Sequence, residues 1–181
     1  MVLSKKYNFL ILNPAKTATK AVFTYYQSIN QSEQYKLGWH SDVNHTIRQS
    51  QKYKINLKNI KKYCFIRGPI DRAISMFHMT YEYYSLSDRK SKFKSSLMSD
   101  NMLPMEKYYK HNNEIWADEV FKFEDLKNSI KLINQAHNID LPEFQVRSSD
   151  YDVNYKEWLD VETINYICDR EKETFKLINS I

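Results

Sequence analysis

A chain of 181 residues is expected to form a single domain, residues 1–181, and is long enough to bury one hydrophobic core. Its ordinary charged fraction and its high aromatic content, with 14 tyrosines, exclude an intrinsically disordered protein, and no apolar run of about 18 residues predicts a membrane span. The net charge of +5 suits an anionic partner such as a nucleotide or an acidic or sulfated sugar, but the sequence carries no pattern typical of nucleic-acid binding.

The first predicted strand is Phe9 to Leu12, a short apolar run that ends at Asn13-Pro14. The residues before it lead directly into this strand without a cleavage-like stretch, so we expect no signal peptide. Cys64 and Cys168 lie far apart without metal or redox spacing, which predicts reduced thiols in a cytoplasmic protein. After Thr17 the apolar residues recur every three or four positions and predict a helix that includes Ala18, Ala21, Val22, Tyr25 and Ile29.

Residues 30–62 are polar and predict little beyond a loop around Gly38 to His40. A second strand, Tyr63 to Ile66, is apolar enough to lie in the middle of a sheet. A second helix is expected to open at Pro69, because proline suits the first helical position and Asp71 complements the helix dipole. The apolar stripe of this helix consists of Ile70, Ala73, Ile74, Phe77 and Tyr81.

Residues 85–112 are charged and rich in serine, which predicts a surface excursion with short helices. A third strand is expected over Glu119 to Phe123, followed by an amphipathic helix and then by a last helix that Asp160 caps. Strands that alternate with helices predict an α/β fold with a parallel sheet and right-handed crossovers. Ligands of such sheets bind at the carboxyl ends of the strands, where Lys16 and Arg67 are both expected.

The first motif is PAKTATK, residues 14–20, between the first strand and its helix. Such a turn exposes backbone N–H groups, Lys16 adds a positive charge, and Thr17 and Thr19 add hydroxyl donors, so the loop suits a phosphate. A capped turn without any ligand would have the same pattern. The loop of nucleotide triphosphatases, G-x-x-x-x-G-K-[ST], requires glycines that this motif lacks, so a loop around the β-phosphate of ATP is not expected.

The second motif is CFIRGPIDRAISMF, residues 64–77. Arg67 follows the second strand and Ser75 lies in the helix, so that a guanidinium group and a hydroxyl would converge on one phosphate. Arg72 is expected to pair with Asp71 or with another neighbour. The full pattern R-x-P-x-D-R-x-x-S is much harder to obtain by chance than any one of these charges.

Together the two motifs resemble those of sulfotransferases that depend on 3′-phosphoadenosine-5′-phosphosulfate (PAPS). AKTATK is similar to their 5′-phosphosulfate loop, close to P-K-[TS]-[GA]-[ST]-T, and FIRGPIDRAISMF is similar to their 3′-phosphate segment, close to F-x-R-x-P-x-[DE]-R-x-x-S. FKFEDL, residues 121–126, and the C-terminal stretch from Tyr155 resemble the carbohydrate-type, sulfotransferase family 2-like branch, so the likeness spans nearly the whole chain. Within the loop, Ala18 stands where glycine is usual, and Lys20 stands where a threonine or serine is usual.

The resemblance implies a P-loop-type, three-layer α/β fold in which helices flank a central parallel sheet. The donor would be PAPS, the product adenosine 3′,5′-bisphosphate (PAP), and the acceptor a hydroxyl group, expected on a carbohydrate; the scheme requires no metal. Lys16 would stabilise the charge that develops on the bridging oxygen and the 5′-phosphate. The residues implied in donor binding are Lys16, Thr17, Ala18, Thr19, Lys20, Arg67 and Ser75, the last two at the 3′-phosphate.

A histidine would act as general base towards the acceptor hydroxyl, because its ordinary pKa lies near neutrality. The stretch GWHSDVNHTIRQS contains two candidates, His40 and His45. Members of the carbohydrate-type branch carry such a histidine upstream of the 3′-phosphate arginine, at a spacing that favours His45 and leaves His40 as the alternative. Glu124 is expected at a helix start, with a place in the acceptor cleft as the alternative.

Two other functions stay open at this point. A nucleotide kinase of the P-loop type would depend on ATP and Mg²⁺, and the missing glycines and the Arg67–Ser75 combination argue against it. A non-catalytic relative would bind PAP or a glycan without transferring sulfate, and the presence of Lys20 motivates this alternative. Neither a nucleic acid nor a membrane is an expected partner, and the oligomeric state is open.

Overall fold

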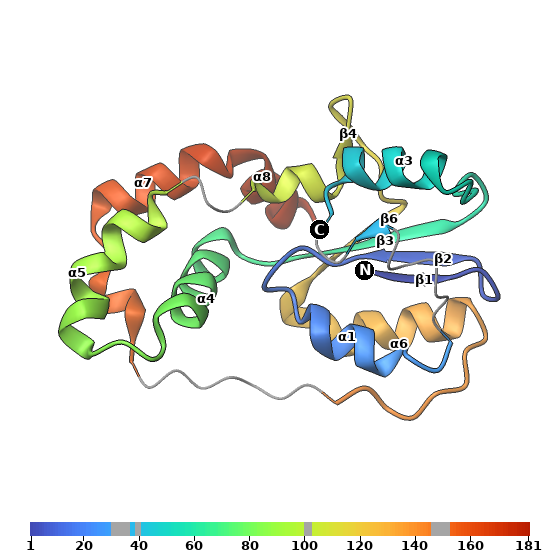
Figure 1. Cartoon of the computed structure of the whole chain (residues 1–181), viewed down its shortest axis with the longest axis horizontal. Coiled ribbons are helices and arrows are strands. Elements are labelled where there is room, and N and C mark those ends of the chain that lie inside the picture. The colour runs from blue at the N-terminus through green and yellow to red at the C-terminus, as the bar shows by residue number, and fades with distance from the viewer. Residues whose placement is uncertain (30–36, 39–40, 100–102, 146–152) are drawn as a thin grey trace.

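The computed structural model describes residues 1–29, 37–38, 41–99, 103–145 and 153–181, and Figure 1 traces them. In this part of the chain, the main sheet has four strands in the order β1-β2-β3-β6. These strands are β1 (Val2–Ser4), β2 (Phe9–Leu12), β3 (Lys61–Ile66) and β6 (Glu119–Lys122). Strand β1 pairs antiparallel with β2, whereas β2 with β3 and β3 with β6 are parallel, so the sheet is mostly parallel, as predicted.

The register of the parallel strands brings their carboxyl ends together. Leu12, the last residue of β2, pairs with Cys64, and Ile66, the last residue of β3, pairs with Lys122 of β6. Strand β2 continues through the first motif into α1 (Thr19–Tyr25), and β3 continues into α4 (Pro69–Tyr81). Both motifs therefore leave the sheet at the same edge.

Alternate residues of each strand are buried on opposite faces of the sheet. Ile11 and Phe65 belong to the apolar cluster that includes α1 and α6 (Leu126–Ala136). Leu12 and Ile66 belong to the cluster that includes α3 (Val43–Lys52). Strands that are covered on both sides are apolar along their whole length, which is why the sequence reads FLIL and YCFI. Helices thus flank the sheet on both faces (Figure 1).

A second group of helices lies beside the carboxyl edge of the sheet (Figure 1). Helices α4, α5 (Leu86–Leu97) and α7 (Val161–Arg170) share an apolar cluster that contains Phe77 and Phe93, whose ring centroids are 5.0 Å apart. The other described elements are α8 (Lys172–Ser180), the strands β4 (Lys110–His111) and β5 (Glu114–Ile115), and the 3-10 helices η1 (Met105–Tyr108), η2 (Phe123–Asp125) and η3 (Tyr155–Trp158).

The predicted strands and the helix that opens at Pro69 are confirmed. The prediction of a surface stretch with short helices over residues 85–112 is largely confirmed, because α5 and η1 both lie there and most of α5 is exposed, although its Phe93 is buried in the helical cluster. The single last helix was wrong: α7 begins after the predicted cap Asp160, and Glu171 separates it from α8. Among the helices that the structure describes, none combines the length and the apolar character needed to cross a bilayer.

Candidate functional site

The loop between β2 and α1 has a backbone shape that is unusual for a segment without glycine. Lys16 has φ 69 and Ala18 has φ 52, so both residues lie in the left-handed region. For a residue with a Cβ this conformation costs roughly 1–2 kcal/mol, because the Cβ crowds the following carbonyl oxygen. Other interactions, within the loop or from its surroundings, must therefore offset this strain.

The two threonine hydroxyls of the loop donate to the loop's own carbonyl oxygens. Thr17 Oγ1 donates to the Pro14 oxygen at 2.7 Å, and Thr19 Oγ1 lies 3.1 Å from the same oxygen and 3.5 Å from the Asn13 oxygen. Both threonines are buried. In this state the hydroxyls stabilise the turn rather than face a ligand, so an anion would rely first on the backbone N–H groups and the cationic side chains.

Two arginines of the second motif hold the first motif in place. Arg67 Nη1 donates to the Lys16 carbonyl oxygen at 3.2 Å, and Arg72 Nε donates to the Ala15 carbonyl oxygen at 3.2 Å. The Arg67 guanidinium also lies over the ring of Phe123, 4.6 Å from its centroid. Consecutive carbonyl oxygens of the loop thus accept hydrogen bonds from the protein, and the two motifs form one structural unit.

Arg72 does not pair with Asp71, which instead forms an ion pair with Lys156 at 2.9 Å. Arg72 is fully buried and pairs with Glu171, at the junction of α7 and α8, at 3.4 Å. Burial lowers the pKa of Arg72, and the neighbouring Glu171 carboxylate acts in the opposite direction. The predicted pairing with Asp71 was wrong, because the partner of Arg72 is distant in the sequence and was not recognisable from local spacing.

A cavity of about 910 Å³ brings the two motifs together. Its size is that of pockets that hold drug-sized or nucleotide-sized ligands. Its walls come from the loop and α1, from α4, and from the segment after α6. The lining residues are Lys16, Ala18, Thr19, Lys20, Ala21, Thr24, Tyr25, Arg67, Ser75, Met79, Phe123, Glu143, Phe144 and Gln145.

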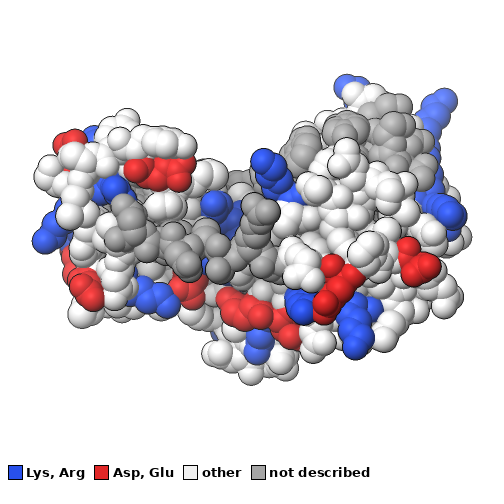
Figure 2. Space-filling view, turned by 90° about the horizontal axis from the view of Figure 1, so that it is seen from below, with Lys and Arg blue, Asp and Glu red and all other residues white. Residues whose placement is uncertain are grey.

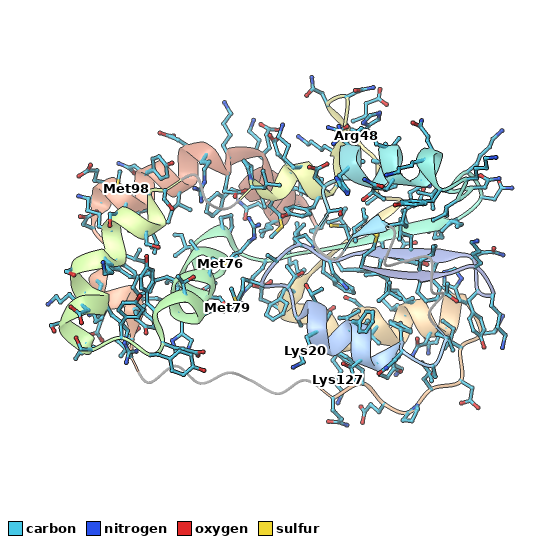
Figure 3. The ribbon with its side chains drawn as sticks, in the orientation of Figure 1. Lys20, Arg48, Met76, Met79, Met98 and Lys127 are labelled. Carbon is cyan, nitrogen blue, oxygen red and sulfur yellow. The ribbon has the colours of Figure 1, made fainter. Side chains whose placement is uncertain are left out.

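The charged and polar groups of this cavity come from both of its sides. Figure 3 shows Lys20 on α1 and Met79 on α4 on the two sides of the cavity, and Arg48 on α3, on the other face of the sheet. Lys20 is exposed, whereas the Ser75 side chain is almost fully buried on α4. Of the predicted donor-binding residues, the cavity brings together all except Thr17, which is fully buried.

In the part of the chain that the structure describes, no predicted general base lines this cavity. His45 lies in the first turn of α3, where its backbone N–H donates to the capping Asp42 at 2.7 Å, and it is not among the residues that line the cavity. His40 lies outside the described residues. Glu124 is exposed in η2, and its Oε1 lies 3.5 Å from the Gly68 nitrogen, next to the start of α4.

Sequence reasoning missed the wall that follows α6. Phe144 packs edge-on against Tyr25, with ring centroids 5.1 Å apart, and Tyr25 donates through its hydroxyl to the Pro142 carbonyl oxygen at 2.7 Å. Glu143 pairs with Lys127 at 2.7 Å, which lowers the pKa of that carboxyl group. The segment has no periodicity, and its aromatic residue was the only signal that could have pointed to the cavity.

Among the described residues, no group of three or more histidine, cysteine, aspartate and glutamate side chains is arranged to hold a metal ion. Comparison of the chain with protein-family models, with curated proteins and with solved structures gives no match in any of the three cases. The function of the cavity therefore has to be inferred from the chemistry of the residues that line it.

Proposed function

We propose that this protein is a PAPS-dependent sulfotransferase that transfers a sulfuryl group to a hydroxyl acceptor, most simply a carbohydrate. The observation that carries the proposal is the shared cavity: Lys16 and Arg67, 51 residues apart in the sequence, both line it, together with Ser75. The sequence motifs assign the same three residues to the two ends of one donor. A finer fold assignment, the P-loop-type three-layer architecture, forms part of the same proposal.

The residues of the cavity fit the chemistry of this donor. PAPS carries phosphate groups at both ends of a ribose, and the cavity offers the cations of Lys16, Lys20 and Arg67 to offset their charge. The aromatic rings of Tyr25, Phe123 and Phe144 line the remaining walls and suit the flat face of an adenine. A volume of about 910 Å³ accommodates a nucleotide of this size.

The chain's own residues would act by positioning and by electrostatics. When bound, PAPS supplies an activated sulfuryl group. Lys16 would stabilise negative charge at the 5′ end, assisted by the backbone N–H groups of Ala18 and Thr19, with Lys20 adding positive potential; the Thr17 N–H already donates to the Pro14 oxygen. Arg67 and Ser75 would hold the 3′-phosphate, the group that distinguishes this donor from AMP or ATP.

The general base towards the acceptor is proposed to be His45, with His40 as the alternative. His45 lies at the start of α3 and does not line the donor cavity, so the proposal requires the acceptor to bind outside that cavity, next to the start of α3. Replacing the base by alanine should reduce turnover by roughly 10²–10⁴-fold and leave PAP binding nearly unchanged, because the base contacts the acceptor and not the donor. Measuring both quantities for His45→Ala and for His40→Ala separates the two candidates. Normal turnover in both variants would contradict the assignment of either histidine.

A non-catalytic PAP-binding protein is the second candidate, and one observation favours it. The Thr17 and Thr19 hydroxyls donate to loop carbonyl oxygens, so fewer donors point towards the 5′ end than the sequence predicted. A nucleotide kinase is disfavoured, because the loop lacks the glycines that let a backbone wrap closely around a β-phosphate. A nucleic-acid surface is also disfavoured, because on the face in Figure 2 basic and acidic side chains are interspersed.

Calorimetric titration with PAP, AMP and ATP plus Mg²⁺ tests the proposal, followed by transfer of labelled sulfate from PAPS to a panel of sugars. We expect tight PAP binding, weak AMP binding and transfer to at least one sugar. PAP binding without transfer would favour the non-catalytic candidate, and binding of ATP alone would favour the kinase. In the same titration Arg67→Ala should weaken PAP binding. Arg48→Ala is its matched control, because Arg48 is exposed on α3, on the opposite side of the sheet (Figure 3).

A further inference from the structure

Arg72 is a charged side chain in a completely buried position. It has 0% exposure, and it is among the largest fully buried side chains of the protein. Its Nε donates to the Ala15 oxygen, and its Nη1 donates to the Leu103 oxygen at 3.0 Å and to Glu171 Oε1 at 3.4 Å. Arg72 therefore connects four parts of the chain: α4, the loop of residues 14–20 (the anion loop), the segment before η1 and the start of α8.

The stability of the protein alone does not account for this arrangement. Removing two charges from water costs several kcal/mol per ion, and apolar residues of similar volume are often as stabilising as a buried ion pair. The guanidinium is also incompletely satisfied, because Nη2 has no hydrogen-bond partner among the described residues. An explanation has to come from what the side chain holds in place.

What Arg72 holds is the peptide group next to Lys16. The chain has no cis peptide bond among the described residues, and in a trans peptide the N–H points away from the C=O. Fixing the Ala15 carbonyl oxygen on Arg72 thus directs the Lys16 N–H to the other side of the loop. It also fixes the peptide group that precedes Lys16. Without this contact the backbone of Lys16 would relax from the left-handed region to a less strained conformation.

Glu171 holds Arg72 in turn. Its Oε2 accepts from the Met105 backbone nitrogen at 3.0 Å and from the Thr174 hydroxyl at 3.1 Å, and its side chain is buried. Three groups therefore hold the carboxylate: the Arg72 guanidinium, the Met105 N–H and the Thr174 hydroxyl. The last two belong to parts of the chain that do not line the cavity. This gives the guanidinium one orientation, which a flexible partner would not impose.

We propose that Arg72, oriented by Glu171, is a positioning residue that sets the backbone of the anion loop for the 5′ end of the donor. The inference rests on the proposed function and deepens it. Arg67 and Ser75 serve the 3′-phosphate, whereas Arg72 would not touch the donor and would act only through the Ala15–Lys16 peptide.

The test compares two ligands that share the 3′-phosphate. PAP carries the 5′-phosphate and adenosine 3′-monophosphate lacks it. In the double variant Arg72→Met with Glu171→Gln, both charges are removed while an amide oxygen stays available to the Met105 N–H. We expect PAP affinity to fall about tenfold or more and the affinity for adenosine 3′-monophosphate to stay within about twofold of the wild type.

Two further variants complete the experiment. Arg72→Lys keeps the charge opposite Glu171 but loses the Nε donor, so it should fold and should show the same selective loss. Glu173→Gln, in the first turn of α8, breaks the pair with Lys110 and should leave both affinities unchanged. Thermal unfolding of each variant confirms that the comparison is made on folded protein.

Equal losses for the two ligands, or an unchanged PAP affinity in folded Arg72→Lys and in the double variant, would overturn the positioning role and leave the proposed function intact. If the wild-type protein binds neither ligand, the proposed function fails, and the role of Arg72 fails with it. The selective loss for PAP is the one result that supports both.

Discussion

The loop of residues 13–20 and the helix start of residues 67–75 line the same cavity, but they are stabilised in different ways. The helix start follows ordinary local rules, with Pro69 in its first turn and Asp71 near its positive end. The loop has left-handed residues at Lys16 and Ala18 and no glycine. Its carbonyl oxygens are held by Arg67 and by Arg72, which the helical segment supplies.

The difference shows that the segment of residues 67–75 holds the irregular loop in its conformation. A loop that is strained at two residues keeps its shape only if its surroundings determine that shape. Here the surroundings are guanidinium groups that are fixed by a helix, by Phe123 and by Glu171. We therefore expect substitutions in the loop to affect chemistry most, and substitutions in the helical segment to affect donor affinity most.

Lys16→Ala should have the largest effect of any single substitution in the two segments. On the proposed function it would remove the positive charge at the 5′ end of the donor, so turnover should fall by roughly 10²–10³-fold, whereas PAP affinity should fall less. Steady-state sulfate transfer combined with PAP calorimetry separates the two effects. Lys58→Ala, an exposed lysine before β3, is the control. If the loss in turnover only equalled the loss in affinity, Lys16 would be a binding residue like those of the helix.

Arg67→Ala should lower PAP affinity by roughly 10- to 100-fold, because on the proposed function it would remove a charge-assisted contact to the 3′-phosphate, and because it removes the donor to the Lys16 carbonyl oxygen. Adenosine 3′-monophosphate should lose affinity as well, in contrast to the variants at Arg72. Calorimetry on both ligands, with Arg48→Ala as control, makes this measurement. An unchanged affinity for adenosine 3′-monophosphate would remove Arg67 from the 3′-phosphate site.

Ser75→Ala should have a smaller effect, about a fivefold to tenfold loss of PAP affinity, because a neutral hydroxyl donor contributes about 1 kcal/mol. AMP, which has no 3′-phosphate, should bind the variant and the wild type equally. The same calorimeter runs test this. A loss of AMP affinity of the same size would indicate a general disturbance of α4 instead of a contact with the 3′-phosphate.

The sequence predicted what depends on local patterns and missed what depends on distant contacts. The apolar runs of β2 and β3 and the start of α4 follow from periodicity and from Pro69, and the structure has them at those places. The partner of Arg72 lies 99 residues away, and no spacing rule reaches that far. The same holds for Phe144, which joins the cavity wall through Tyr25, more than 100 residues earlier in the chain.

That three residues singled out by the sequence line one cavity follows for the same reason. Lys16, Arg67 and Ser75 follow strands whose carboxyl ends must meet at one edge of a parallel sheet, so their shared cavity follows from topology. The orientation of the Thr17 and Thr19 hydroxyls depends on the local turn, and the sequence motif predicted the opposite direction for them. Side-chain identity thus predicts which groups meet, but not which of them point outward.

The smallest expected effect concerns the strain in the loop itself. Ala18→Gly should raise the free energy of unfolding by about 0.5–1 kcal/mol, because glycine adopts the left-handed conformation without a Cβ clash, and this gain exceeds its greater freedom in the unfolded chain. Ala21→Gly, three residues later inside α1, is the matched control and should lower the free energy of unfolding by about 1 kcal/mol. Urea unfolding of the two variants gives the sign of each change. If both variants were destabilised equally, position 18 would not be strained, and the loop would not need Arg67 and Arg72 to hold its shape.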